Sequence, residues 1–397
     1  MNPNTIRTID YWFGQPICFL LTLLNFSSPK KGVPKKIIFL KFIEQGATVL
    51  AYSALKRATE LVGRENVYFC VFENNRPILD ILDIIPQKNI ISIRDKSLFS
   101  FLGSAFSAIL KIRREKVDTS IDMEFFSRAS AIFSFMSGAK TRIGLHRFTS
   151  EYPYRGNLMT HRIQYNPYLH ISEYYFSLVE ASLQDPSEVP MMKIPKKEFT
   201  AALPVFTPGE TEKKELQARI ESAFGTGTKK TVILNPNASD LLPLRKWEKQ
   251  KFIELGKKII SENESARIII SGAPAEQADA EDICKQIGST KAVSFAGKTS
   301  LRGLLVLYSL ADVLVTNDSG PGHFSSLTNI RTIILFGPET PKLFGPISPN
   351  AQVIWKELAC SPCVSILNHR FSPCDNNVCM KSIQVQEVYE AVKKNLN

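Results

Sequence analysis

The sequence lacks several motifs that would assign a common chemistry. It has no GxxxxGK[ST] phosphate loop, which argues against a P-loop NTPase. It also has no DxD pair of aspartates with which to hold a metal ion beside a diphosphate. No module of interleaved basic and aromatic residues is present, so nucleic acid is not an expected partner.

Cysteine is scarce, with an odd total of seven in 397 residues. Cys18, Cys70 and Cys284 are scattered singly, so a disulfide framework is not expected. The remaining four crowd into the tail segment CSPCVSILNHRFSPCDNNVC as Cys360, Cys363, Cys374 and Cys379. They are candidates for a structural zinc site, although their spacing is not that of the commonest zinc fingers. Reduced thiols in a covering loop are the alternative.

An apolar run near the N-terminus, YWFGQPICFLLTLLNF, is short for a membrane span. It does not fit a secretory signal, because only Arg7 precedes it and lysines follow it in SSPKKGVPKK. We expect residues 1–35 to form a separable membrane-associating segment, with aromatic and leucine side chains in the headgroup boundary and lysines over anionic lipid. A helix docked on the protein's own surface is the alternative.

Positive charge exceeds negative charge overall, with 49 Lys and Arg against 38 Asp and Glu and a net charge of +11. An excess of this size favours an anionic partner, such as an acidic membrane surface or a phosphorylated small molecule. The charge alone does not choose between them.

Beyond Lys36, short β-branched runs alternate with longer amphipathic ones, as in βαβ units around a parallel sheet. Between two such sets lies a proline-rich, charged passage without clear periodicity. We therefore predict two α/β domains, at 36–195 and 229–397, joined by a linker at 196–228. Strands are expected at 36–42, 66–72, 89–93, 119–123, 231–236, 266–272, 292–297, 312–318 and 332–337.

The segment LVTNDSGPGHFSSLTN, residues 314–329, is the strongest candidate for a ligand site. A strand is expected to end near Thr316 and a helix to begin at His323, and a helix N-terminus after a parallel strand attracts phosphate. Asp318 suits sugar hydroxyls and Ser319 a phosphate oxygen, while capping of the helix is the alternative for both. Glycines would let the backbone approach a ligand, and His323 is either a phosphate ligand or a structural donor. The two glycines are Gly320 and Gly322.

The blocks LADVLVTNDSGPGHFSSL and TIILFGPETPKLFGP resemble the signature of glycosyltransferase family 9, the heptosyltransferase family of lipopolysaccharide assembly. The stretches VILNPNASDLLPLRKWEKQKFIELGKKI, KTRIGLHRF and the tail ending in CMKSI are similar to that family as well. The resemblance covers roughly residues 36–390. It implies the GT-B fold, in which two Rossmann-like domains with parallel sheets face a cleft and the C-terminal domain holds a nucleotide-sugar donor.

The resemblance implies an inverting transfer, which requires a base for the acceptor hydroxyl and a stabiliser for the departing nucleotide diphosphate. Arg245, Lys246 and Ser319, together with the helix N-terminus after Gly322, are the expected stabilisers, so no cofactor or metal ion is required. Glu276 is a candidate for the nucleoside ribose, with a merely exposed position as the alternative.

The family's proposed base is an aspartate that follows a glycine after the first strand, and this chain departs from that pattern. In KFIEQGATVLAYSALK, Gly46 matches the glycine and Ala47 falls on the aspartate. We expect Glu44 to take over as the base, with Asp122 or Glu124 as alternatives. Loss of activity is a further alternative.

A glycolipid acceptor is expected to meet a basic surface that includes Arg128, Arg142 and His146, for which a solvated face is the alternative. The expected location is cytoplasmic, peripheral on the inner membrane. Two other functions stay open. A nucleotide-sugar epimerase of the same fold would have no use for a lipid-facing N-terminus, and a non-catalytic sugar-nucleotide or lipid-binding protein would be consistent with Ala47.

Overall fold

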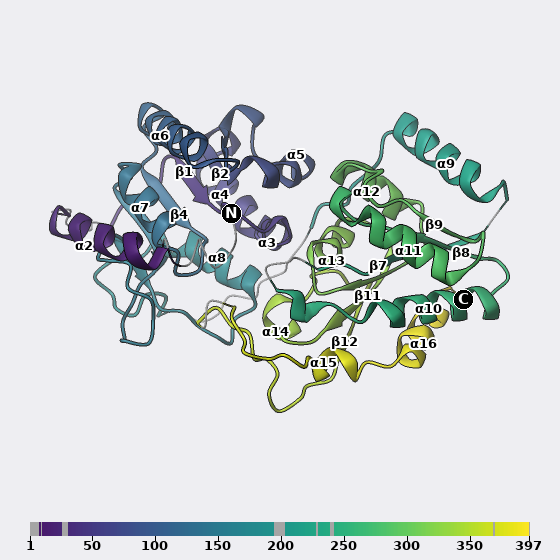
Figure 1. Cartoon of the computed structure of the whole chain (residues 1–397). Helices are drawn as coiled ribbons and strands as arrows, with labels where there is room; N and C mark the ends of the chain where they lie inside the picture. Colours follow the sequence, from purple (N-terminus) through teal and green to yellow (C-terminus); the bar gives the residue numbers. More distant parts are fainter. Residues whose placement is uncertain are drawn as a thin grey trace. The chain divides into compact units, whose positions relative to one another are not determined.

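The computed structural model describes residues 8, 10–25, 31–193, 203–227, 229–238, 242–367 and 370–396. The chain divides into two compact units, Met1–Ala202 and Leu203–Asn397, here called unit 1 and unit 2 (Figure 1). Each is an α/β unit built on a six-stranded sheet, and each is described by itself.

The sheet of unit 1 has the strand order β3-β2-β1-β4-β5-β6, and all of its neighbouring strands are parallel. Helices cover both of its faces, so its central strands are buried on both sides and read as continuous apolar runs. The strands are β1 (Ile37–Leu40), β2 (Val67–Phe72), β3 (Ile90–Ile93), β4 (Thr119–Asp122), β5 (Thr141–Leu145) and β6 (His161–Ile163). The helices are α2 (Gln15–Leu23), α3 (Gln45–Leu50), α4 (Tyr52–Val62), α5 (Pro77–Leu82), α6 (Leu98–Arg114), α7 (Arg128–Met136) and α8 (Ile171–Ala181).

The N-terminal helix α2 is part of unit 1. It packs against α7, with Cys18 fully buried beside Ala131, Leu158 and Met159. A π-helical turn, η1 (Asp10–Gly14), precedes it. The expectation of a separable segment is therefore wrong for α2, whose inner side belongs to the core of unit 1. None of the helices that the structure describes is long and apolar enough to cross a membrane.

Unit 2 repeats the architecture with the strand order β12-β11-β10-β7-β8-β9, again with all neighbouring strands parallel. Its strands are β7 (Lys230–Asn235), β8 (Ala266–Ile270), β9 (Ala292–Ser294), β10 (Val313–Asn317), β11 (Arg331–Phe336) and β12 (Ala351–Trp355). Its helices are α9 (Glu210–Phe224), α10 (Lys249–Glu262), α11 (Gln277–Ile287), α12 (Leu301–Ser309), α13 (Gly320–Phe324), α14 (Pro341–Phe344), α15 (Val378–Lys381) and α16 (Val385–Leu396).

The start of this half of the chain differs from the predicted organisation. The segment 196–228, predicted to be a linker, contains α9, which packs against α12. The Arg302 guanidinium fixes it by an ion pair of 2.6 Å to Glu212, whose side chain also accepts a hydrogen bond from the backbone N–H of Gly209 at the start of the helix. The second half therefore begins well before residue 229.

Candidate functional site

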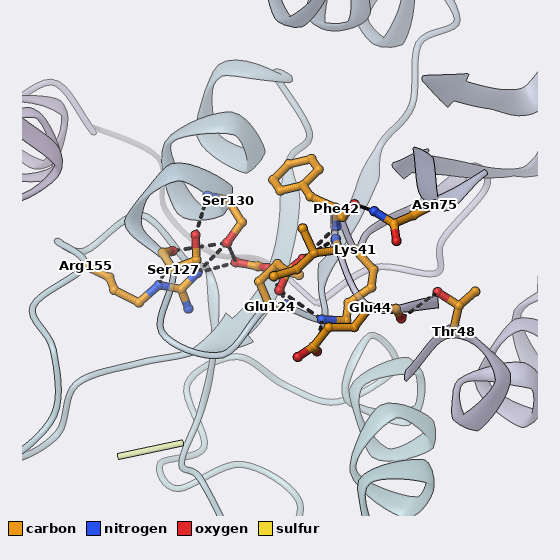
Figure 2. A network of polar contacts seen from close by, with 11 residues as sticks. Lys41, Phe42, Glu44, Thr48, Asn75, Glu124, Ser127, Ser130 and Arg155 are labelled. Carbon is orange, nitrogen blue, oxygen red and sulfur yellow. Dashed lines mark hydrogen bonds and ion pairs between the residues drawn. The ribbon is translucent and has the colours of Figure 1, made fainter. Parts of the chain in front are cut away.

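In unit 1, the carboxyl end of β1 carries a buried lysine between two carboxylates (Figure 2). β1 lies in the middle of the sheet, between β2 and β4, so the residue that follows it is enclosed. The Lys41 side chain is only 1% exposed, and its Nζ lies 3.0 Å from Glu44 Oε2 and 3.0 Å from Glu124 Oε2. A charged group buried to this extent requires oppositely charged or hydrogen-bonding partners.

Glu124 anchors the loop that follows β1. Its Oε1 accepts hydrogen bonds from the backbone N–H groups of Phe42, at 2.6 Å, and Ile43, at 3.4 Å, while Oε2 accepts from Lys41. The residue is buried. Both carboxylate oxygens therefore already hold protein groups, which makes Glu124 a positioning residue rather than a base.

Glu44 is the more open of the two carboxylates around Lys41, with 21% of its side chain exposed. It occupies the N-cap position of α3 with φ 72° and ψ 80°, a left-handed conformation that a non-glycine residue adopts only at a cost. Such strain is concentrated at functional positions. Ala47, which is expected to fall on the aspartate position of the resembled family, lies in α3 and is half-buried.

Asp122 ends β4 and is completely buried. Its carboxylate forms an ion pair with the Arg155 guanidinium and accepts hydrogen bonds from Ser130 Oγ, at 2.8 Å, and from the backbone N–H of Glu124, at 3.0 Å. Burial raises the pKa of Asp122, and the charge of Arg155 opposes that rise. An enclosed carboxylate with these partners is suited to holding β4 and α7 together, not to meeting a substrate.

The arginines predicted to face an acceptor are buried instead. Arg128 forms an ion pair with Asp10 of η1 and donates to the backbone carbonyl of Tyr154. Arg142 donates to the carbonyls of Leu158, at 2.6 Å, and Ala139, at 2.8 Å. These guanidiniums fasten the N-terminal segment and the loop after β5 to unit 1.

His146 follows β5 and is half-buried. Its ring meets Phe148 edge to face, with centroids 5.0 Å apart. Burial, together with the charges of Arg162 and Arg155, lowers the pKa of His146 to about 4. The imidazole is therefore neutral at physiological pH and would contact a substrate as a hydrogen-bonding group, not as a cation.

In unit 2, Asn317 at the end of β10 ties three segments together. Its amide donates to the carbonyl of Pro236 at 3.0 Å, and its carbonyl oxygen accepts from the backbone N–H of Trp247 at 3.0 Å. The Trp247 ring is buried against Phe252. This packing places the residues just before Trp247 beside the loop that follows β10.

Arg245, in the 3₁₀ turn η5 (Pro243–Arg245), contacts two buried carboxylates at the carboxyl edge of the second sheet. Its Nε lies 3.3 Å from Asp318 Oδ2, and its terminal nitrogen lies 2.5 Å from Glu339 Oε2. Burial raises the pKa of Asp318, and the Arg245 charge opposes this rise. The same burial, again opposed by Arg245, raises the pKa of Glu339 to about 7.

The loop after β10 differs in detail from the expectation. α13 begins at Gly320, not at His323, and has five residues. Ser319 is at the N-cap position, but its side chain does not cap the helix, since its Oγ donates to the Asn317 carbonyl at 3.1 Å. His323 is half-buried on α13.

The two glycines of this loop are required by packing inside unit 2. A Cβ on Gly322 would lie 2.8 Å from Ile334 Cδ1, and one on Gly320 would lie 3.0 Å from the Phe324 ring. These contacts account for both glycines without a bound ligand. They are also compatible with a ligand bound at this loop.

Lys246 and Glu276 complete the set predicted for the donor. Lys246 is half-buried directly after η5. Glu276 ends the 3₁₀ turn η6 (Pro274–Glu276), after β8, and its Oε2 accepts a hydrogen bond from the backbone N–H of Ala273 at 2.6 Å. That bond gives Glu276 a local role in holding the turn.

The tail cysteines are all free thiols. Cys379 is buried beneath the loop, where a Cβ on Gly337 would meet its Sγ at 3.1 Å, whereas Cys360 and Cys374 are exposed. Within the described ranges, no three His, Cys, Asp or Glu side chains are grouped so that they could hold a metal ion. Cys379 lies in α15, and the other three thiols lie in the irregular segment between β12 and α15.

Two residues of these clusters were not predicted from the sequence. Lys41 ends an apolar strand, and a lone charge at the end of a buried run is a signal that a buried partner exists. Glu339 follows β11 in the FGPET turn. It is 94 residues from Arg245 in the sequence, so no local pattern indicates that the two side chains pair.

Comparison with known proteins adds to this geometry. The sequence profile of glycosyltransferase family 9 (heptosyltransferase) matches residues 106–370, more than half of the chain. A lipooligosaccharide heptosyltransferase 2 of Campylobacter jejuni is 31% identical over 177 residues, which cover 42% of this chain and 51% of that protein. The matched stretch thus spans about half the length of that relative.

Two solved structures share the fold. The Escherichia coli ADP-heptose lipopolysaccharide heptosyltransferase II superposes with a TM-score of 0.67 at 18% identity, covering 91% of this chain and 98% of that one. The family 9 glycosyl transferase of Veillonella parvula superposes with a TM-score of 0.69 at 16% identity, covering 93% and 99%. The predicted α/β class and GT-B fold are confirmed by these likenesses, which at such identity concern the fold alone.

Proposed function

Because this chain belongs to glycosyltransferase family 9, the heptosyltransferase family, we propose that it is a glycosyltransferase of lipopolysaccharide-core assembly. In this proposal it moves a sugar from a nucleotide-diphosphate sugar to a lipopolysaccharide-core or related glycolipid acceptor. The names of its relatives, a lipooligosaccharide heptosyltransferase 2 and an ADP-heptose heptosyltransferase, support heptose as the sugar and ADP-heptose as the donor.

The observation that carries the proposal is the pairing of Arg245 with Asp318 at the carboxyl edge of the second sheet. Ligands of open parallel sheets bind at this edge. A guanidinium beside a carboxylate offers one charge to a diphosphate and another to sugar hydroxyls. Among the described residues, Asp318 Oδ2 accepts no hydrogen bond from the protein, so it has capacity for a donor hydroxyl.

The proposed transfer uses Glu44 as the base. The acceptor hydroxyl gives its proton to the Glu44 carboxylate, its oxygen forms a bond to the anomeric carbon, and the bond from that carbon to the diphosphate breaks. Attack opposite the leaving group inverts the anomeric configuration. Arg245 and Lys246 supply positive charge to the departing diphosphate, and Ser319 and His323 at the loop after β10 supply hydrogen bonds, so no metal ion is required.

The deciding experiment is a transfer assay with the full-length chain. ADP-heptose and a heptose-deficient core glycolipid are supplied, and the product is identified by mass spectrometry. Inversion is read from the anomeric proton coupling of the product, and metal independence from unchanged turnover in EDTA. Product formation supports the proposal. ADP-heptose binding without product, with any acceptor tried, would instead favour a non-catalytic binding protein, the function consistent with Ala47.

We further propose that the N-terminal segment associates with the cytoplasmic face of the inner membrane. The inner side of α2 is docked on α7, but its outer side exposes aromatic and leucine side chains, with Lys31 and Lys35 exposed after it. Such a helix lies in the membrane interface instead of crossing it. The exposed apolar residues are Tyr11, Trp12, Phe13, Ile17, Phe19, Leu20, Leu23 and Leu24.

A further inference from the structure

A second helix of unit 1, α6, exposes an apolar stripe. Phe99 is 88% exposed and Phe106 is 60% exposed, and Leu102 and Leu110 are exposed with them. At 100° per residue these four positions fall within roughly 80° of the helix circumference. They form one continuous ridge, here called the α6 ridge.

The α6 ridge lies on a different side of the helix from the residues that hold it. Ala108, Ile109 and Ile112 pack with the strands β1, β2 and β3 and with Phe133 of α7. The fold of unit 1 therefore needs only the inner side of α6. The outer aromatic and leucine side chains have no role in that core, and an exposed patch of this kind marks an interaction surface.

Basic residues flank the α6 ridge at both ends. Arg94 and Lys96 are exposed before the helix, on either side of Asp95, and Arg113 and Arg114 are exposed in its last turn, before Glu115 at the C-cap. The helix itself contains no acidic residue. Unit 1 as a whole has 26 Lys and Arg against 18 Asp and Glu, so it carries eight of the eleven net positive charges.

The α6 ridge and the exposed side of α2 lie over the same face of the sheet. α6 and α7 share a core on that face, where Phe133 of α7 joins Ala108 and Ile109 of α6. α2 in turn packs against α7 (Figure 1). Both apolar surfaces therefore point away from the same side of the sheet of unit 1.

We infer that the α6 ridge is a second membrane-contacting surface, which docks this side of unit 1 on an anionic lipid bilayer together with α2. Phenylalanine and leucine side chains enter the headgroup boundary, while the flanking arginines and lysines contact lipid phosphates. Two separated contacts fix the orientation of unit 1, which a single amphipathic helix cannot do.

Charge favours a bilayer over a second copy of the chain. Two α6 ridges paired antiparallel would place Arg94 and Lys96 beside the partner's Arg113 and Arg114, and a parallel pair would oppose each basic end to itself. Both pairings bring like charges together across an apolar contact, which is unfavourable. An anionic surface complements both ends at once.

The test uses the full chain and vesicles of phosphatidylcholine, with or without phosphatidylglycerol, in a flotation assay. The variant Phe99→Gln/Leu102→Gln/Phe106→Gln removes the α6 ridge. The matched control, Tyr168→Gln/Val205→Gln/Phe371→Gln, removes three exposed apolar side chains elsewhere. The α6 variant should lower binding to anionic vesicles by roughly tenfold or more, and the control should not.

Two further measurements distinguish the apolar contact of the α6 ridge with lipid from the electrostatic contact of its flanking basic residues. A Phe106→Trp probe should show a blue-shifted emission with anionic vesicles, and the Lys96→Glu/Arg114→Glu variant should weaken binding, as should added salt. The inference extends the membrane association proposed for α2 but rests on different residues and needs no transferase activity. Calorimetry should show that the α6 variant binds ADP as the unmodified chain does. This result distinguishes failure of the membrane inference from failure of the proposed transferase function.

The inference is overturned if the α6 variant binds anionic vesicles as the unmodified chain does, or if the Trp probe is unshifted. It is also overturned if sedimentation shows an oligomer that the α6 variant dissociates, because the ridge would then be an interface between copies.

Discussion

Lys41 and Glu44 form an ion pair of 3.0 Å in which the lysine is almost completely buried and the glutamate is partly open to solvent. The pair gives the proposed base a fixed place at the carboxyl end of β1. It also gives Lys41 a role beyond charge balance, since the same ammonium group holds Glu124, which anchors the loop that carries Glu44.

Replacing Glu44 by glutamine should abolish most of the transfer while leaving donor binding intact. The amide keeps the size and much of the hydrogen bonding of the carboxylate but cannot take a proton. The rate should fall by about 10² to 10⁴, the usual contribution of a general base. Single-turnover kinetics with ADP-heptose and calorimetric binding of ADP measure the two quantities separately.

The counter-test restores the family pattern at Ala47. An Ala47→Asp change on the Glu44→Gln background should recover part of the rate if residue 47 occupies the family's aspartate position. An Ala47→Asn change on the same background is the matched control and should recover none. Normal turnover of Glu44→Gln would remove Glu44 from the mechanism.

Replacing Lys41 by methionine should destabilise the protein by about 3–5 kcal/mol, the cost of leaving a buried carboxylate without its partner. Urea unfolding measures the loss. The double variant Lys41→Met/Glu124→Gln should recover part of it, because the second change removes the unpaired charge. A loss below about 1 kcal/mol, the range of an exposed pair, would contradict this reading of the cluster.

Replacing Asp318 by alanine should weaken donor binding by about 1–3 kcal/mol, if its carboxylate holds sugar hydroxyls. Asp318→Asn, which keeps a hydrogen-bond acceptor, should lose less. The binding of ADP alone should change less than that of the intact nucleotide-sugar. Equal affinity for the nucleotide-sugar in the unmodified chain and Asp318→Ala would exclude this role.

Lys246 is a better probe of the diphosphate than Arg245. Arg245 also pairs with the buried carboxylates of Asp318 and Glu339. Among the described residues only Glu339 has a second ion-pair partner, Arg370, so removal of Arg245 mixes binding with stability. Lys246→Gln should weaken ADP binding by an amount that shrinks as salt is added, because the lost contact is charge-assisted. Equal ADP affinity at low salt would refute a Lys246 contact.

Much of the fold could be predicted because its strands are buried on both faces. β1, β2, β8, β10 and β11 are built mainly of consecutive apolar residues, a signal that is visible locally in the sequence. The missed strands lack that signal. β5 contains the buried Arg142, β6 has three residues, and β12 is only partly buried at the sheet edge.

The clusters were harder to predict because they join distant residues. Lys41 and Glu124 are 83 residues apart, and nothing local to either shows the pair. Arg128 and Arg142 have the sequence context of an exposed basic surface, yet their guanidiniums satisfy backbone carbonyls left open by the loop at 154–158. A basic side chain in a loop-rich region can serve either purpose, and only the packing decides between them.

Deleting residues 1–25 should destabilise unit 1, since α2 covers Ala131, Leu158 and Met159 and η1 pairs with Arg128. Loss of this cover should cost on the order of 2–5 kcal/mol, as for other buried apolar contacts. Trp12→Ser/Phe19→Ser, which changes only the exposed side, should lower vesicle binding without changing stability. An unchanged urea midpoint for the deletion would show that α2 is not part of the core.

The final prediction concerns pH and Glu339, whose pKa burial raises to about 7 against the opposing charge of Arg245. The unfolded carboxyl titrates near its usual value of 4.5. Between these two values the folded state holds a proton that the unfolded state has lost, so the unfolding free energy falls as pH rises through this window. At about 1.4 kcal/mol per pKa unit, the full loss attributable to Glu339 is roughly 3–4 kcal/mol.

Glu339→Gln isolates this loss, because glutamine does not titrate and the neighbouring Asp318 is retained. Urea unfolding at pH 5 and pH 8 should show a larger decrease in the unmodified chain than in the variant. The variant should therefore be relatively more stable at the higher pH. If the two proteins lose the same free energy between these pH values, Glu339 titrates as an ordinary carboxylate, and the Arg245 cluster is already fully ionised at the lower pH.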